Sequence, residues 1–295
     1  MRDFTEGEVS KPRLQHVIET MNAIKVAAIQ INSGKNKEKN LSQAGRLIKE
    51  AALKKAYLIV LPEVFNFRGD LKEAAKMAEY IPGFSTNFIS NLAKKYKTWI
   101  LIGSMMEKSR KRGSGTPPSK PFNTSLLINP QGKIISKYRK MHLFDIKLGK
   151  KEILESKRNQ AGTKPETVSI GKFKVGLSIC YDLRFPELYR LYSKKGVHIL
   201  CIPSSFTDQT GKAHWHTLIR ARAIENLCYV IAPNQFGKGS GGVKTYGHSL
   251  IVDPWGKILA EGPSNKEAVL VRDIDLDYLN KTRKNLPALE HRKIL

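Results

Sequence analysis

The sequence predicts an α/β protein that folds as a single domain, a four-layer α-β-β-α sandwich. Three observations support this prediction. Short apolar runs alternate with segments of helical periodicity along most of the 295 residues, Pro/Gly turns mark hairpins within that alternation, and no linker divides the chain. Strands, helices and hairpins mixed in this way are best covered when two sheets pack together with helices outside.

The alternation begins near residue 24. Residues 1–22 show no clear periodicity, so we expect an N-terminal extension, disordered or draped over the body, before a domain that spans 23–295. The first apolar run, 24–31, predicts a strand. Residues 38–55 have the spacing of a helix, and 57–61 is apolar throughout, which is typical of a buried strand.

The same alternation continues to the middle of the chain. We expect a helix over 85–96 and a strand over 99–104. The stretch 108–120 is rich in Lys, Arg, Gly, Ser and Pro and predicts a loop. Two strands, 123–128 and 133–138, then flank a turn that contains Pro and Gly, so a hairpin is predicted.

The second half repeats the pattern and ends in paired strands. A Pro-Trp-Gly turn at 254–256 predicts a further hairpin. The expected strands are 173–179, 197–202, 228–233, 246–252, 257–259 and 268–273, and the expected helices are 186–194 and 213–227.

Composition bounds the class of protein. A 41% hydrophobic content in 295 residues suffices for one large domain with a substantial core. The longest apolar runs are too short to span a bilayer, and acidic residues stand near the N-terminus in place of a charged-then-apolar leader. Three cysteines without C-x-x-C spacing suggest neither a disulfide framework nor a zinc knuckle. These features predict a cytoplasmic protein with reduced thiols and no membrane association.

The net charge of +25 raises the alternative of a protein that binds nucleic acid or another polyanion. The Lys/Arg clusters are dispersed, however, and they match no nucleic-acid-binding module and no base-stacking array of aromatic side chains. We therefore interpret them as a solvated surface and expect no nucleic-acid partner, while a non-catalytic, polyanion-binding protein stays the alternative of another class.

The segment from Gly176 to Glu187 is the most informative one for function. An apolar run delivers Cys180 directly into a polar turn that contains Pro186. A strand that ends in a thiol and opens into a helix holds the sulfur on rigid backbone beside unpaired N–H groups, which favour anionic sulfur and oxygen. A free cysteine is more often a small buried hydrophobe, so further residues must support a role as nucleophile.

Two other charged residues also follow predicted strands. Glu63 comes directly after the buried run 57–61, and Lys140 lies in a basic cluster after the strand 133–138. Each taken alone is an ordinary loop acid or solvated lysine. Together with Cys180 they supply a proton shuttle, an oxyanion stabiliser and a nucleophile for covalent acyl transfer.

Two motifs are set aside. Residues 237–242 fit G-x-G-x-x-G, but a strand-like segment follows where a phosphate-binding helix would begin, so we expect a flexible loop. His214 and His216 have metal-like spacing, yet no third ligand lies near them in the sequence, and Trp215 between them is expected in the core or in a pocket wall. We therefore expect no metal and no cofactor.

The blocks LPEVFN, KYRKMHLFD and GLSICYDLRFPE resemble the three signature blocks of the nitrilase superfamily of carbon–nitrogen hydrolases. The resemblance covers about residues 24–292. Further blocks, such as RARAIENLCYVIAPNQ, YGHSLIVDPWG and NLPALEHR, are similar to the amidase branch that contains deaminated glutathione amidase and omega-amidase. The resemblance also implies a homodimer or a higher homo-oligomer.

The resemblance implies roles for six residues. Glu63, Lys140 and Cys180 correspond to a Glu-Lys-Cys triad, and Glu155 corresponds to a second glutamate, on a less specific match. The Tyr181 backbone N–H is expected to join Lys140 in stabilising the oxyanion. Arg184 stands where it could bind a substrate carboxylate, although an ion pair with Glu187 or Asp182 is an equal alternative.

The expected substrate is a small amide that carries a carboxylate. Nitrilases usually have Trp-Glu after the cysteine, whereas this chain has Tyr181 and Asp182, which favours amides over nitriles. The resemblance places deaminated glutathione first and α-ketoglutaramate second. Hydrolysis of an N-carbamoyl amino acid or of N-carbamoyl-β-alanine is a further alternative with the same chemistry.

Overall fold

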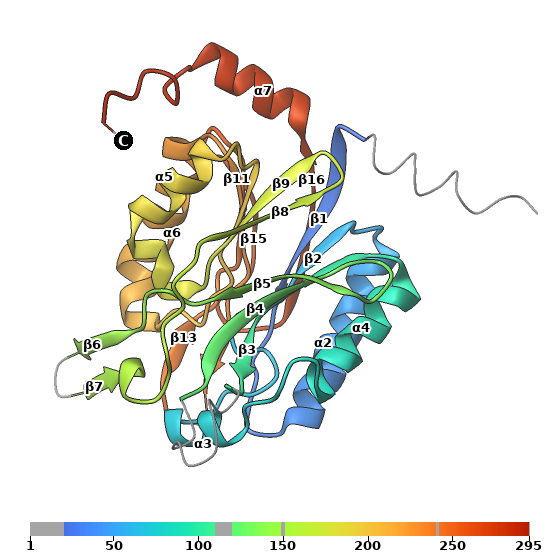
Figure 1. The fold of residues 1–295 in the computed structure, drawn as a ribbon, viewed down its shortest axis with the longest axis vertical. Coiled ribbons are helices and arrows are strands. Elements are labelled where there is room, and N and C mark those ends of the chain that lie inside the picture. Colours follow the sequence, from blue (N-terminus) through green and yellow to red (C-terminus); the bar gives the residue numbers. More distant parts are fainter. Residues whose placement is uncertain (1–20, 110–119, 149–150, 240–241, 295) are drawn as a thin grey trace, which may run out of the picture.

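A computed structural model describes residues 21–109, 120–148, 151–239 and 242–294. Most of the expected extension 1–22 and of the expected loop 108–120 lies outside these ranges, so both stay predictions. Two six-stranded sheets form the body of the protein (Figure 1). The first sheet runs in the order β16 (Ala268–Asp275), β1 (Ala23–Gln30), β2 (Leu58–Val60), β3 (Trp99–Glu107), β4 (Phe122–Ile128) and β5 (Ile134–Arg139).

The second sheet faces the first. Its order is β15 (Ile258–Glu261), β14 (Leu250–Val252), β11 (Tyr229–Ala232), β10 (Ile199–Cys201), β9 (Phe173–Leu177) and β8 (Glu166–Ile170). The strands β1, β2 and β3 are parallel to one another, and so are β9, β10 and β11. Because parallel neighbours end at the same edge, each sheet brings several strand ends together.

Helices cover the outer faces of both sheets, which completes the four predicted layers (Figure 1). Alternate side chains of β1 show how the layers are held. Val26 belongs to the core cluster that also contains Leu177 of the second sheet, whereas Ile29 belongs to the cluster that contains Ile48 of a covering helix. The covering helices are α2 (Lys37–Leu53) and α4 (Phe84–Tyr96) on the first sheet, and α5 (Pro186–Lys194) and α6 (Asp208–Asn226) on the second.

Several short elements were not predicted. They are α3 (Leu71–Lys76), β6 (Asp145–Leu148), β7 (Lys151–Leu154), β8, β12 (Phe236–Lys238) and α7 (Leu276–Asn285), together with 3-10 turns at Glu155–Lys157 and Cys180–Arg184. Most of these span too few residues to show a period. The interpretation of 237–242 as a loop was partly wrong, since Gly237 and Lys238 pair with β13 (Lys244–Tyr246). No described helix is both long and apolar enough to cross a membrane.

Candidate active site

Cys180 lies at a sharp bend between a strand and a helix. Strand β9 ends at Leu177, the 3-10 turn begins at Cys180, and α5 begins at Pro186. Cys180 has a φ of +48°, a left-handed conformation that is unfavourable for a residue with a side chain. Its N–H donates to the Pro203 carbonyl at 2.9 Å, which anchors the bend to the loop after β10. The bend aims the thiol into a cavity off the strand end, and only 7% of the residue is exposed.

Lys140 connects two carboxylates beside this thiol. Its Nζ lies 3.0 Å from Glu63 Oε1 and 2.9 Å from Glu155 Oε2. The second oxygen of Glu63 accepts a hydrogen bond from the Ser205 backbone N–H at 2.8 Å. Glu63 and Lys140 follow strands β2 and β5 of the first sheet, whereas Cys180 follows β9 of the second. The candidate site therefore lies at the seam between the sheets.

Glu155 reaches the same site from the 3-10 turn that follows β7. Its carboxylate accepts hydrogen bonds from the Phe144 backbone N–H at 2.7 Å and from Asn159 Nδ2 at 3.1 Å, in addition to the contact with Lys140. Glu155 is 5% exposed. The structure thus brings the second glutamate next to the three other predicted residues, even though its sequence surroundings were loosely patterned.

The charges of this cluster balance in a way that leaves the thiol protonated. Burial lowers the pKa of Lys140, but the carboxylates of Glu155 and Glu63 outweigh it and raise that pKa well above its usual range. Burial raises the pKa of Glu155, and Lys140 reverses this effect, so the pKa is lowered. For Cys180, burial and the neighbouring carboxylate of Glu63 both raise the pKa well above its usual range, against the opposing effect of Lys140. A thiolate in this site requires that its proton be taken up nearby.

Asn123 is a member of the site that the sequence did not reveal. Its Nδ2 donates to Glu63 Oε1 at 2.9 Å and lies 3.5 Å from Glu155 Oε1, so one amide bridges both carboxylates. The residue is buried, and its Oδ1 accepts no hydrogen bond from any described residue. No motif marks this position, because an asparagine that starts a strand has no distinctive local pattern.

Asp182 joins the cysteine bend to the segment that carries Lys140. One carboxylate oxygen accepts from the Tyr138 hydroxyl at 2.7 Å and from the Ile179 N–H at 2.8 Å, and the other accepts from the His142 N–H at 3.0 Å. Asp182 is fully buried. It is therefore engaged with these groups and not with Arg184, and the structure shows no Arg184 ion pair to Asp182 or Glu187 within the described ranges.

A cavity of about 650 Å³ opens onto the cluster. This volume lies in the range typical of small-molecule sites. Tyr181 lines the cavity, and its backbone N–H donates to no other described residue. Arg184 is not itself in the lining, but its guanidinium lies over the rings of Tyr181 and Phe206, which are, at 5.7 and 5.2 Å. The lining side chains include Glu63, Lys140, Glu155, Cys180, Lys157 and Arg158.

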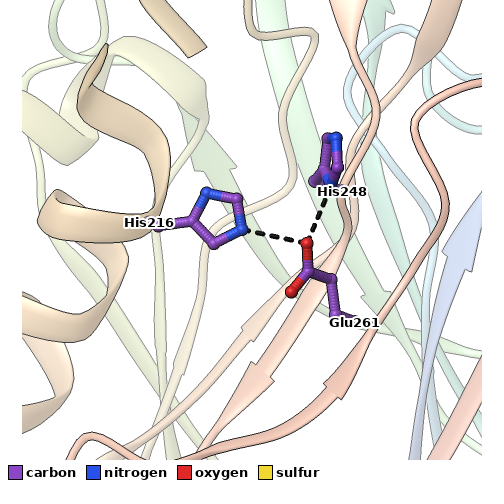
Figure 2. A group of neighbouring side chains, drawn as sticks. All are labelled: His216, His248 and Glu261. Carbon is purple, nitrogen blue, oxygen red and sulfur yellow. Dashed lines mark hydrogen bonds and ion pairs between the residues drawn. The ribbon is translucent and has the colours of Figure 1, made fainter. Parts of the chain in front are cut away.

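The two histidines set aside as a metal decoy separate in space. His214 Nδ1 lies 3.2 Å from Arg184 Nη1. Trp215 is fully buried, as expected for a core residue. His216 instead lies beside His248 and Glu261, and Glu261 Oε1 accepts from both imidazoles (Figure 2). Spacing in the sequence did not reveal these partners of His216, because both come from segments distant in the chain. We call these three residues the His–Glu–His cluster.

A four-layer sandwich that gathers a cysteine, two carboxylates and a lysine in one cavity has the parts of a thiol-dependent hydrolase. Comparisons with known proteins define the family. Residues 25–284 match the carbon-nitrogen hydrolase family, to which this chain belongs. The protein is accordingly a hydrolase of the amidase type, which acts on carbon–nitrogen bonds other than peptide bonds.

Individual relatives cover nearly the whole chain. The chain is 40% identical to deaminated glutathione amidase of Dictyostelium discoideum over 282 residues, which are 93% of this chain and 96% of the relative. It is 39% identical to omega-amidase NIT2 of Xenopus tropicalis, with 92% and 96% covered. Among solved structures, the chain is similar to the crystal structure of Saccharomyces cerevisiae Nit3, described as a member of branch 10 of the nitrilase superfamily. The two superpose with a TM-score of 0.83 at 34% sequence identity, and the match covers 94% of this chain and 98% of Nit3.

Proposed function

We propose that this protein is a thiol-dependent amidase that hydrolyses a small carboxylate-bearing amide to an acid and ammonia. The observation that carries the proposal is the contact of Lys140 with Glu63 and Glu155 beside the Cys180 thiol, in one cavity of a carbon-nitrogen hydrolase. Nucleophile, base and cation are there held by elements of both sheets, so that reacting groups meet without further rearrangement.

The first half-reaction forms a thioester. Glu63 takes the Sγ proton as the sulfur of Cys180 attacks the amide carbonyl carbon. A base is needed at this step because the raised pKa of the buried thiol keeps it protonated. The carbonyl oxygen becomes an oxyanion, which Lys140 Nζ and the Tyr181 N–H stabilise. As the tetrahedral intermediate collapses, Glu63 gives its proton to the departing nitrogen and ammonia leaves.

The second half-reaction reverses these roles. Water gives a proton to Glu63 and its oxygen attacks the thioester carbon, so that a second oxyanion forms at the same two donors. Collapse of this intermediate breaks the carbon–sulfur bond, releases the carboxylic acid and returns the proton to Cys180. Glu155 keeps Lys140 in place through both steps and does not itself exchange a proton, since the low pKa of its carboxyl keeps it ionised.

Cationic side chains in and beside the cavity support a carboxylate on the substrate, although acidic side chains such as Asp70 and Glu152 also line it. Lys157 and Arg158 line it as exposed cations, and the guanidinium of Arg184 stacks on two lining rings and pairs with no described carboxylate. We propose that Arg184 binds the substrate carboxylate. The relatives named deaminated glutathione amidase favour deaminated glutathione as the substrate, with α-ketoglutaramate second and N-carbamoyl amino acids or N-carbamoyl-β-alanine third.

An ammonia-release screen tests the substrate class. It compares deaminated glutathione, α-ketoglutaramate, N-carbamoyl-β-alanine, simple aliphatic amides and nitriles, and carbon dioxide release identifies the carbamoyl substrate. Arg184→Lys should raise KM for the preferred acidic amide at least about tenfold and leave a neutral aliphatic amide unaffected, because lysine lacks the planar fork. An equal effect on both substrates would assign Arg184 a structural role.

Replacement of the nucleophile tests the mechanism. Cys180→Ala or Cys180→Ser should lower kcat/KM by at least about 10⁴-fold in a folded protein, because no other group can form the thioester. Cys201→Ala, which changes another buried cysteine, serves as the matched control and should retain activity. Near-normal amide hydrolysis by Cys180→Ala would falsify the mechanism.

We also propose that the protein acts in the cytoplasm as a homodimer or higher homo-oligomer and without a nucleic-acid partner. The dispersed lysines support the absence of a nucleic-acid partner, and the resemblance to the superfamily supports the homo-oligomer. Light scattering after size exclusion measures the oligomeric state. Filter binding of DNA and RNA over a salt series tests whether the positively charged surface binds nucleic acid. Tight binding with a steep salt slope would contradict the expected absence of a nucleic-acid partner.

A further inference from the structure

The His–Glu–His cluster lies outside the cavity that holds Cys180, since none of its members lines that cavity. His216 Nε2 is 3.0 Å and His248 Nδ1 is 2.7 Å from Glu261 Oε1. The three ligand atoms all lie within 4.8 Å of one another. Figure 2 shows both imidazoles directed at the same carboxylate oxygen.

Three separate elements hold these side chains in place. His216 lies within helix α6, Glu261 is the last residue of β15, and His248 lies between β13 and β14 with a φ of +49°. The indole N–H of Trp215, the neighbour of His216, donates to the His248 carbonyl at 2.7 Å. The backbone at His248 is therefore tied to α6, so that the donor atoms are positioned by packed structure and not by a loop alone.

We propose that His216, His248 and Glu261 form a binding site for a divalent transition-metal ion of the Zn²⁺ class. Two imidazole nitrogens and one carboxylate oxygen are ligands that zinc prefers, at about 2.0–2.2 Å each, whereas Mg²⁺ and Ca²⁺ prefer oxygen only. Tetrahedral ligands at these lengths are about 3.3 Å apart. The two nitrogen–oxygen distances of 3.0 and 2.7 Å are slightly shorter than this, and the two imidazole nitrogens lie within 4.8 Å of each other.

The proton balance of binding is favourable. Without metal, each imidazole donates an N–H to Glu261; with metal, the same nitrogens must offer lone pairs, so each proton moves to the other ring nitrogen through solvent. His216 Nδ1 and His248 Nε2 bond to no described residue, and this change therefore breaks no protein hydrogen bond at those atoms.

The exposure of the cluster permits entry of the ion and of a fourth ligand. The side chains of His216, His248 and Glu261 are 32%, 24% and 39% exposed. Three protein ligands leave one tetrahedral position for water. The net charge of +25 disfavours loosely held cations elsewhere on the surface, so specific binding should give a stoichiometry of one ion per chain.

Calorimetric titration of the full-length protein with ZnCl₂ tests the site. The Cys180→Ala background removes the active-site thiol, which could bind zinc by itself, and makes the result independent of the proposed amidase chemistry. We expect one ion per chain with a micromolar or lower Kd and a rise in Tm of roughly 5 °C at a hundredfold excess over Kd. A Kd in the millimolar range would overturn the proposal.

Variants distinguish a metal site from a cluster that is held only by hydrogen bonds. Glu261→Gln keeps an oxygen that accepts from both imidazoles but is a poor ligand, so it and His248→Ala should weaken zinc binding by more than about 100-fold. Glu261→His supplies a third imidazole and should retain binding. His291→Gln, which removes an exposed histidine outside the cluster, should change nothing. Equal zinc affinity in Glu261→Gln and the parent would overturn the proposal.

Discussion

The active-site cluster and the His–Glu–His cluster both join acidic side chains to nitrogen groups from distant parts of the chain, but they differ in burial. The side chains of Lys140 and Glu155 are 2% and 7% exposed. Those of His248 and Glu261 are 24% and 39% exposed. The side chains of the first cluster are almost entirely buried, whereas those of the second are partly exposed to water.

This difference determines how much each contact matters. In the buried cluster, Glu155 has several donors besides Lys140, because a desolvated charge without partners costs far more than its ion pair returns. In the exposed cluster, water can replace any lost partner, so single contacts contribute little. Burial thus makes the active site depend on the fold, while the His–Glu–His cluster can change its partners at low cost.

Lys140→Met provides the strongest test of this comparison. It leaves two buried carboxylates without their cation, so we expect a loss of about 3–5 kcal/mol in the free energy of unfolding and of about 10²–10³-fold in kcat. Urea denaturation and ammonia release measure the two effects. Lys54→Met, which breaks the exposed pair with Glu50, should change stability by less than about 0.5 kcal/mol. Similar losses in both variants would contradict the role assigned to burial.

Asn123→Ala tests the bridge between the two carboxylates. Loss of a buried donor to Glu63 should cost about 1–3 kcal/mol and also lower kcat at unchanged KM, because the carboxylate loses its orientation. Asn226→Ala removes another buried amide, which donates to a helical carbonyl, and should lower stability without affecting kcat. Asn123→Asp should be less active than Asn123→Ala, because it adds a third carboxylate. An unchanged kcat in Asn123→Ala would make this residue purely structural.

The two clusters should also differ in how their contributions to stability respond to acid. The folded pKa values of Glu155 and Glu261 are lowered, so their contributions to stability are present above the unfolded pKa of about 4.3 and are lost as pH falls through the folded value. Glu155→Gln should flatten the acid side of a plot of stability against pH more than Glu261→Gln, since solvent screens the exposed group. Urea midpoints between about pH 3 and 7 measure this. Equal flattening would show that burial is not decisive.

The smallest effect is expected for Glu261→Gln at neutral pH in buffer with a chelator. Without metal, the lost pairs are exposed, and stability should change by less than about 1 kcal/mol. A thermal denaturation scan measures the change. A loss as large as that of Lys140→Met would show that this cluster is a structural element of the fold in its own right.

The main parts of the fold and site could be predicted because they have local signals. Glu63, Lys140 and Cys180 each follow a predicted strand, and the end of a strand is where α/β proteins commonly place functional groups. Helices α2, α4 and α5 begin and end within two residues of the predicted bounds. Helix α6 begins at Asp208, five residues before the predicted start at 213, because polar residues in its first turns conceal the period.

Other features were hidden because they depend on long-range contact. Asn123 has no motif, and its role appears only in the contacts of its side chain with Glu63 and Glu155. His216 lies 32 residues before His248 and 45 before Glu261 in the chain, so spacing could not show the cluster.

The amino-acid sequence by itself determined the alternation of strands and helices, the cysteine at a strand end and the identity of the chemical groups, since periodicity and turn residues act over a few neighbours. Only the tertiary structure decided which groups meet and which are buried. The approach of the turn after β7 to the first sheet placed Lys140 between two carboxylates, and the approach of α6 to β15 left His216 and Glu261 at the surface. Burial sets the strength of charge interactions, and it is a property of the assembled fold.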